Sequence, residues 1–467
     1  MFSTIMPLKQ RGQSLVLSLI LMSFAAMTVL YSYNTSKLNV ESTKLQHTAD
    51  NTAYSVATIA ARDFNFKAYT NRASVANQVA IAQMVGLSSW FNMTEKFAQN
   101  ACTALCWVPY LGQVLSGIES VVGGINTVAQ PIFEVLIFAE NAILLALDLA
   151  QEAVHYAGAI GSVATAQEVV AANDDHADLD LMQNPLLINS VHDVWMTFQE
   201  SHSRNDDESN KTQFNDFKAV ILESRDPFST KRSYKLGFPW SLSFFPIRWR
   251  TQKAGGSELV SGGSGRAETW SSMDTISFHL SRFKCSWSGC RWRGFRETEL
   301  GWGSTRSDSR ASSSSFNNDN YWGDSRDKNS GASNYADDEE ETRGFYSGVQ
   351  SFYGLSNSAF QKNHTDNIAV VVSKSQNELR TTSSVPIVSS NLNPAVDEEL
   401  SGDRLTALST AQAYYSRPRD LMEQYSGWAR ADSQHEYGNL YNPFWQSRLS
   451  ESTTTERSVV LLLTEAL

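Results

Sequence analysis

The sequence predicts an α+β protein in which a long N-terminal transmembrane helix and a helical region precede an antiparallel β-rich C-terminal domain with a disordered loop. Three observations predict this class. The chain opens on a long run without glycine or proline, helical patterns follow, and short alternating strand patterns with glycine come after them. Helices followed by strands, rather than a regular alternation of the two, are typical of the α+β class.

Composition limits the function classes. The chain has 467 residues, with 38 basic and 49 acidic side chains and a formal net charge of -11. The length predicts roughly two to three domains. The acidic total argues against a dedicated nucleic-acid-binding protein, although local patches can differ from the total. A multi-span transporter is not expected, because only one stretch is apolar enough to span a membrane.

That stretch is the first element. Lys9 and Arg11 are followed by an uncharged run from Gly12 to Ser36, whose centre, Leu15–Tyr33, is almost wholly apolar. About 20 such residues cross a bilayer as a helix, and basic residues before it place the N-terminus in the cytoplasm. We expect contact with the lipid bilayer through Leu15–Tyr33. The alternative is a secretory signal cleaved near residues 23–25, and both interpretations export the rest of the chain.

The second element continues the first. The 73 residues between Gly12 and Gly86 contain no glycine or proline. As one helix they would extend about 110 Å. Beyond the membrane, an apolar stripe recurs at helical spacings, which predicts a packing helix rather than a catalytic domain; its members are Leu38, Leu45, Ala49, Thr52, Val56 and Ile59.

An acidic block follows. Residues 97–203 hold twelve Asp and Glu and not one Lys or Arg. We predict helices over 104–128 and 131–172, with Pro131 as an early helix residue. The apolar run 135–150 is predicted to be a buried helix, because acidic residues interrupt it. The cluster Asp174–Asp180 could bind a divalent cation weakly or form a solvated helix end.

The next block is basic and rich in tryptophan. Residues 225–306 hold fourteen basic and six acidic residues, and alternation at 242–250 and 275–280 predicts short antiparallel strands, with turns at the glycine pairs 255–256 and 262–263. Mixed guanidinium and indole groups suit anionic ligands. In the alternative, the tryptophans fill the sheet core and acidic groups neutralise the arginines. The candidate surface-binding residues are Arg248, Trp249, Arg250, Arg291, Trp292 and Arg293.

The C-terminal part mixes both structures. Residues 303–343 are rich in Ser, Asn and Asp and predict a loop. Residues 368–372 predict a buried strand, and residues 403–415 predict a helix. The expected segments are therefore a cytoplasmic tip and transmembrane helix (1–36), an extended helix (37–96), an acidic helical region (97–224), a basic Trp-rich β region (225–302), a low-complexity loop (303–343) and a C-terminal α+β region (344–467).

Four cysteines fall in two close couples, Cys102 with Cys106 and Cys285 with Cys290. In an exported chain an even count predicts disulfides, and bonding within each couple is the simplest of the three pairings. The alternative is a four-cysteine zinc site, but these spacings depart from the usual one.

Motifs of enzymes are missing from the sequence. No HExxH, Gly-x-Ser-x-Gly or phosphate-binding glycine loop occurs. We therefore expect a non-enzymatic protein with no cofactor, no metal and no small-molecule substrate. An exported hydrolase is the remaining alternative.

Both ends of the chain resemble one family. Residues 10–17, Gln-Arg-Gly-Gln-Ser-Leu-Val-Leu, followed by an apolar helix, resemble the start of TadE/TadG-like proteins of Tad (Flp) pilus systems. The alanine-rich continuation at 45–57 and the segment 61–80 look like TadG-related proteins. Residues 414–418 and 439–449 are also similar to that group.

The resemblance implies a pilin-like helix in a protein of the bacterial inner membrane, with the bulk of the chain in the periplasm. It also implies a role in pilus assembly or as a minor pilin. Other pilus or secretion-assembly proteins would then pack against the N-terminal helix at residues 38–85. Whether the protein is incorporated into a surface pilus stays open. Gly12 is the possible processing site, but Leu17 stands where relatives have Glu. No Asp-x-Ser-x-Ser motif of an adhesion domain occurs. The alternative function is a surface or pilus-tip adhesin that binds anionic glycan through the basic aromatic region.

Overall fold

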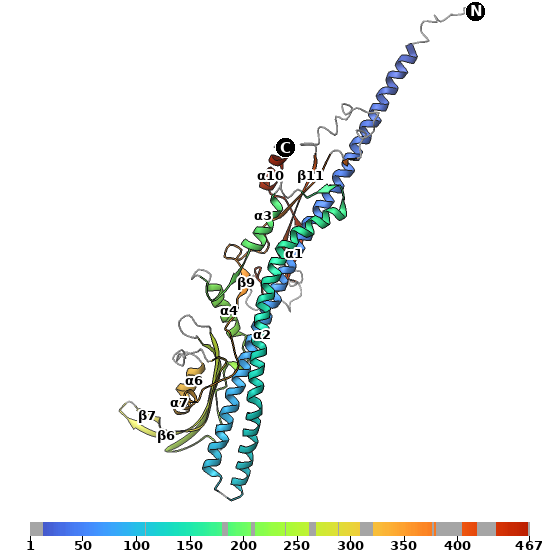
Figure 1. Cartoon of the computed structure of the whole chain (residues 1–467). Coiled ribbons are helices and arrows are strands. Elements are labelled where there is room, and N and C mark those ends of the chain that lie inside the picture. The colour runs from blue at the N-terminus through green and yellow to red at the C-terminus, as the bar shows by residue number, and fades with distance from the viewer. Residues whose placement is uncertain are drawn as a thin grey trace, which may run out of the picture. The chain divides into compact units, whose positions relative to one another are not determined.

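The computed structural model describes residues 13–107, 109–179, 185–206, 211–238, 240–260, 268–287, 289–308, 321–375, 378–379, 404–417 and 436–465. Long helices occupy the first part of the chain and strands most of the rest (Figure 1). The α+β expectation with a long N-terminal apolar helix and an antiparallel, sheet-rich C-terminal part is confirmed.

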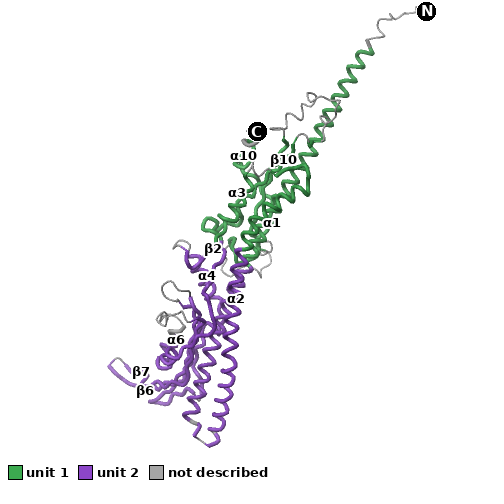
Figure 2. The backbone as a smooth tube through the Cα atoms, viewed as in Figure 1, with its two compact units in different colours: residues 1–68, 153–200, 355–467 green, residues 69–152, 201–354 purple. Residues whose placement is uncertain are grey.

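The chain divides into two compact units, each built from segments that are distant in sequence (Figure 2). Unit 1 comprises residues 1–68, 153–200 and 355–467, and unit 2 comprises residues 69–152 and 201–354. The chain therefore passes between the units four times, within the two long helices and at the short strands β2 (Gln199–His202) and β9 (Phe352–Leu355). The six consecutive segments predicted from the sequence do not reveal that each unit is assembled from distant parts of the chain.

Helix α1 runs without interruption from Gln13 to Leu105. Among the described residues it alone is long and apolar enough to cross a membrane, and none of that apolar segment is buried. Beyond the segment, five of the six residues of the predicted stripe are buried inside unit 1, with Leu45, Ala49, Thr52 and Val56 0% exposed and Leu38 1% exposed, while Ile59 is half-buried. The expected long helix is thus confirmed, and it continues through Gly86.

Helix α2 spans Leu111–Asn173 and lies beside α1 (Figure 1). The prediction of two helices divided before Pro131 is wrong, because Pro131 lies inside one continuous helix. The prediction that 135–150 is a buried helix is also wrong, since Val135, Phe138 and Leu149 each expose at least 60% of their surface. The described residues cover only one side of α2 along this run.

Unit 1 contains a four-stranded antiparallel sheet in the order β1 (Ala177–Asp178), β10 (Ile368–Ser375), β11 (Arg404–Tyr415) and β12 (Trp445–Ser450). Strand β10 confirms the buried strand predicted at 368–372. The helix predicted at 403–415 is wrong, because these residues form β11 between β10 and β12. Helices α3 (Leu186–His192), its π-helical continuation (Asp193–Thr197) and α10 (Thr454–Glu465) complete the unit.

The core of unit 1 combines aromatic packing with a buried ion pair. The ring of Phe64 lies 4.8 Å from that of Trp445 and 5.6 Å from that of Phe198. Lys67, 0% exposed, donates to Asp63 at 2.8 Å and to Gln199 at 2.6 Å. An unpaired buried charge costs several kcal/mol, roughly 3–5 when one partner is lost, so these groups depend on each other.

Unit 2 contains a six-stranded sheet in the order β3 (Tyr234–Lys235), β5 (Ile247–Val260), β6 (Thr269–Ser286), β7 (Gly289–Arg306) and β8 (Glu341–Thr342), with β4 (Leu242–Phe244) beside β5. Its long strands β5, β6 and β7 are drawn in yellow-green to yellow in Figure 1. Neighbours are antiparallel except β7 and β8. Helices α4 (Lys211–Glu223), α5 (Pro227–Thr230), α6 (Tyr321–Lys328) and α7 (Ser330–Asp338) accompany it.

Two sequence expectations change in this unit. Helices α6 and α7 lie in the second half of the segment predicted as a loop, and 309–320 lie outside the described residues. Gly255 and Gly256 do not form a turn, because both lie inside β5 opposite Asp274 and Met273 of β6. The second glycine pair, 262–263, lies outside the described residues.

Candidate functional site: a basic aromatic tip

The candidate site is the end of the unit 2 sheet, where β6 and β7 continue past their neighbours as a two-stranded ribbon (Figure 1). We define the basic aromatic tip as residues 242–250, which form β4, its turn and the start of β5, together with residues 280–296 of the ribbon. Register brings the two segments together, because Arg248 lies opposite Ser281 and Trp249 opposite Leu280.

A disulfide closes the ribbon. Cys285 and Cys290 are directly opposed in the register and are bonded, with their Cα atoms 3.9 Å apart. Gly289 in the turn has a φ of +103°, which residues with a side chain rarely adopt. The first cystine, Cys102–Cys106, lies at the end of α1. The predicted pairing within each couple is confirmed, and the four-cysteine zinc site is excluded because these cysteines are bonded.

Aromatic rings cover the tip unevenly. The ring of Phe283 lies 5.4 Å from that of Trp292 and 5.5 Å from that of Phe245. These contacts fix the ribbon, because opposed aromatic pairs stabilise antiparallel strands. Trp287, at the end of the cystine loop, is fully exposed, and Phe244 is 73% exposed. The tip therefore combines rings that hold it together with rings that are free to contact a partner.

The charge of the tip is uniform. Its two segments hold seven basic residues and no acidic residue. Among the described residues, none of these seven cations forms an ion pair within 4.0 Å; they are Arg248, Arg250, Arg282, Lys284, Arg291, Arg293 and Arg296. The alternative in which acidic groups neutralise the arginines therefore does not hold at the tip.

Like charges face each other across the ribbon. Arg282 lies opposite Arg293, and Lys284 lies opposite Arg291. Alternation along the strands places all four cations on one face, spaced by about 7 Å along each strand. Directly opposed like charges destabilise a strand pair, so an anion bound on this face would relieve a repulsion present in the free chain.

The opposite face of the ribbon pairs a cation with an indole. The guanidinium of Arg248 lies 4.8 Å from the ring centroid of Trp292. Its buried Nε has no hydrogen-bond partner among the described residues. Burial, together with the neighbouring Arg250, lowers the pKa of Arg248, although an arginine stays charged at any physiological pH. The tip therefore keeps a charged guanidinium stacked beside the indole of Trp292.

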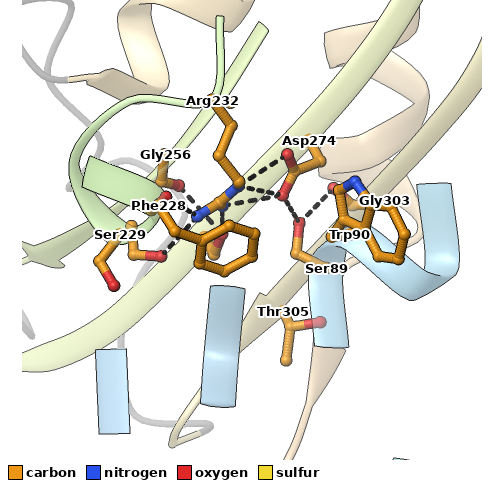
Figure 3. A network of polar contacts seen from close by, with 12 residues as sticks. Ser89, Trp90, Phe228, Ser229, Arg232, Gly256, Asp274, Gly303 and Thr305 are labelled. Atoms are coloured by element: carbon orange, nitrogen blue, oxygen red, sulfur yellow. Dashed lines mark hydrogen bonds and ion pairs between the residues drawn. The ribbon is translucent and has the colours of Figure 1, made fainter. Parts of the chain in front are cut away.

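A buried charge cluster holds the base of the same sheet (Figure 3). Asp274 on β6 is 0% exposed, and its carboxylate accepts from Arg232 Nη2 at 2.8 Å and forms an ion pair with Lys253. Burial alone would raise the pKa of Asp274, but the charges of Arg232 and Lys253 hold it below its ordinary value. Ser89 Oγ of α1 lies 3.0 Å from Asp274 Oδ2 and from the Gly303 carbonyl oxygen. The cluster fixes β6 and β7 to α1 and so orients the ribbon.

The six predicted surface-binding residues all belong to the tip. The structure brings Arg248 and Trp292 into contact, and alternation places Trp249 on the face of Arg291 and Arg293. Prediction from the sequence missed residues that share this surface, namely Phe245, Arg282, Lys284, Trp287 and Arg296. The available signal was the near-symmetry of the sequence about the cystine, since Arg282 and Lys284 before it have Arg293 and Arg291 as partners after it.

Other predicted sites fall elsewhere. Asp174 of the acidic cluster is buried and forms ion pairs with Lys44 and Lys374, both at 3.0 Å, while Asp180 lies outside the described residues. Within the described ranges, no group of three or more His, Cys, Asp or Glu is placed to hold a metal ion. Gly12, the possible processing site, also lies outside the described residues.

A polar groove of about 470 Å³ lies beside α1 and α2 in unit 2. Its amides are already bonded to each other, with Asn126 donating to Asn92 at 3.0 Å and Gln130 donating to Asn126 at 2.7 Å. Asn92 in turn donates to Glu341 at 2.7 Å. These contacts close a network that stabilises the packing of α1 on α2.

No protein family, curated protein or solved structure among those compared matches this chain.

Proposed function

We propose that this chain is a non-enzymatic, single-pass membrane-anchored component of a Tad/Flp-type pilus, with a role in pilus assembly or as a minor pilin-like subunit. The observation that carries the proposal is helix α1. Its first part is apolar and exposed, and the same helix continues as the buried packing element of unit 1. One helix that serves both as anchor and as core is the pilin-like architecture that the terminal sequence motifs imply.

The proposed location follows from the same helix. Leu15–Tyr33 would lie in the bacterial inner membrane, the N-terminus in the cytoplasm and both units in the periplasm. Two bonded cystines support an oxidising compartment for the units. Tyr31 and Tyr33, which expose 54% and 47% of their surface, suit the far membrane interface, where aromatic side chains concentrate.

The test is the intact mass and N-terminal sequence of the protein from purified inner membrane and from sheared pili. We expect an intact N-terminus in the membrane fraction, which supports a retained anchor and an assembly role. A new N-terminus at Gln13 in sheared pili supports a minor-pilin role despite Leu17. A soluble chain that begins after residue 25 and is absent from both fractions would contradict the proposal.

A second candidate function is favoured by the tip. In this view the protein is a surface or pilus-tip adhesin that binds anionic glycan. Seven cations without an acidic partner, four of them opposed on one face, favour a polyanion, and exposed rings such as Trp287 offer stacking surfaces.

Charge reversal separates the two functions. Arg248, Arg250, Arg291 and Arg293 are changed to Glu, and the matched control reverses Arg72 and Lys235, which are exposed in the same unit outside the tip. Lost adhesion with normal piliation supports the adhesin. Lost piliation with a folded variant supports assembly through this surface. Unchanged adhesion and piliation would contradict any role of the tip.

A further inference from the structure

Helix α2 buries polar side chains and exposes many apolar ones. The side that faces the rest of unit 2 carries Asn126, Gln130, Asn141 and Gln151, all at most 6% exposed, together with the buried apolar residues Phe133, Ile137 and Leu144. These amides bond to neighbouring elements, as when Gln130 Nε2 donates to Asn92 of α1 and Gln151 Nε2 donates to Asn71, both at 2.8 Å. Most of the large apolar residues between 114 and 149 lie instead on the opposite side, which no described part of unit 2 covers.

The exposed side has a regular heptad pattern. Apolar residues recur at alternating spacings of four and three, with isoleucine at one core position and valine at the other. The first seven expose 48–66% of their surface; they are Val114, Ile118, Val121, Ile125, Val128, Ile132 and Val135. The pattern continues with Ala139, Ala142, Ala146 and Leu149. Such a repeat is the seam that one helix offers to another in a coiled coil.

Two glycines give an independent indication. Gly117 and Gly124, seven residues apart, flank the seam in the interior of α2, where glycine weakens a helix relative to alanine. A Cβ at either position would meet nothing within 4 Å. Packing within the chain therefore does not require these glycines, whereas a second helix that approaches closely would.

Charge and area indicate what covers the seam. Residues 97–203 contain no Lys or Arg. Helices that lie in a membrane surface are rich in both, so lipid is disfavoured. From 114 to 149 the core and flanking positions hold no charged residue, so two copies would meet without repulsion; the flanking residues are Leu115, Gly117, Val122, Gly124, Ala129, Pro131, Leu136, Phe138, Ile143 and Leu145. Twelve large exposed side chains on this side supply about 800–1,000 Å² per copy, as much as a standard interface buries.

We propose that residues 114–149 of α2 are a self-association surface that packs against the same segment of a second copy in parallel orientation. The parallel orientation rests on the proposed anchor, because copies held in one membrane present α2 in the same direction. β-Branched residues at both core positions favour assemblies of more than two helices. The surface would therefore link several anchored copies side by side.

Disulfide trapping in membranes that contain the full-length protein tests the proposal. Val121→Cys lies in the seam, and a parallel pair brings position 121 of both copies together. Ser120→Cys, exposed on the adjacent off-seam position, is the matched control. We expect an oxidised dimer for Val121→Cys well above the level for Ser120→Cys. Equal levels would overturn the proposal. Linking only in the double variant Val121→Cys/Ala139→Cys would overturn the parallel orientation.

Two further variants separate association from folding. With Val114→Cys as reporter, Ile118→Asp/Val128→Asp should abolish linking without lowering the melting temperature, because both side chains are exposed. Persistent linking would contradict the seam. Gly117→Ala/Gly124→Ala should raise the melting temperature yet reduce linking, and undiminished linking would contradict the close approach.

Failure of this proposal is distinguishable from failure of the proposed function. Linking is measured in isolated membranes and does not depend on pili. If the cysteine variant is cross-linked in membranes, but deletion of the protein leaves piliation unchanged, the pilus role is contradicted and the self-association stands. If deletion abolishes piliation, but the cysteine variant is not cross-linked, the self-association is contradicted and the pilus role stands.

Discussion

At the scale of single residues, Gly255 shows how close packing around a buried charge restricts the sequence. It lies opposite Asp274 in the register of β5 and β6. A Cβ at this position would lie 2.3 Å from Asp274 Oδ1 and 2.8 Å from the Met273 carbonyl oxygen. The glycine thus leaves room for the carboxylate to meet Arg232 and Lys253.

Gly255→Ala should therefore destabilise the protein by about 1–3 kcal/mol, the usual cost of overpacking a filled interior. The measurement is the urea midpoint of unfolding. Gly294→Ala is the control, because it also lies in a strand of this sheet and its Cβ would meet nothing within 4 Å. Equal midpoints for the two variants would show that Asp274 can move aside at little cost.

The same residue explains a limit of prediction. A glycine pair is typical of a turn, and the sequence does not reveal that a carboxylate nineteen positions later occupies the space beside Gly255. Conversely, the basic and aromatic types at 248–250 and 291–293 could be predicted to share a surface. The opposed cations Arg282 and Lys284 were missed, because only the strand register places them there.

At the scale of elements, both cystines enclose very short loops, with sequence separations of 4 and 5. Closing so small a loop removes little freedom from the unfolded chain, about 2 kcal/mol in the chain-entropy account. The Cys285–Cys290 bond therefore acts locally. It holds the end of a ribbon that carries repelling cations and that no neighbouring strand supports.

Cys285→Ala/Cys290→Ala should lower the stability by no more than about 2 kcal/mol, seen as a modest fall in the urea midpoint, and should loosen the tip. Trypsin cleaves after basic residues, so limited digestion should cut faster at Arg291 and Arg293. Mass spectrometry of the fragments measures the site and the rate. The corresponding double variant of Cys102 and Cys106 controls for loss of a cystine as such. An unchanged cleavage rate at the tip would indicate that the aromatic contacts of Phe283 and Trp292 suffice.

Helices and strands could be predicted where the spacing of apolar residues in the sequence was clear. Helix α1 was predictable because a long run lacks both helix breakers, and β10 because its apolar run is short and β-branched. Strand β11 was not, since its small residues fit either period. Its alternate residues Leu405, Ala407, Ala411 and Ala413 are buried, and pairing with β10 and β12 decided the structure. For α2 the apolar residues could be recognised in the sequence. Which of them are exposed could not, because that depends on which face of the helix the rest of the chain covers.

At the scale of the whole molecule, both units rely on buried groups that respond to acid. In unit 1, burial and the charge of Lys67 lower the pKa of His155 to about 4. Burial opposes ionisation of Asp174, yet hydrogen bonds from Lys374 and Lys44 hold its pKa below the ordinary value. In unit 2 the pKa of Asp274 is lowered in the same way. For all three groups the unfolded chain binds protons more readily than the folded one, so stability falls as the pH falls.

The window for His155 lies between about pH 6.5, the ordinary value of histidine, and pH 4. We expect the urea midpoint of the full-length protein in detergent to fall over this range. His155→Gln should reduce the fall, because its amide takes up no proton in either state. The same pH dependence in variant and wild type would assign the effect to the carboxylates instead.

The exposed apolar side of α2 has a consequence for the life of the protein in the cell. A copy without neighbours carries a stripe of isoleucine and valine from 114 to 135 in water, the kind of surface that promotes aggregation. Proteases and chaperones of the cell act on such surfaces. The abundance of the chain should therefore depend on its own local concentration, so that underproduced copies without neighbours are degraded.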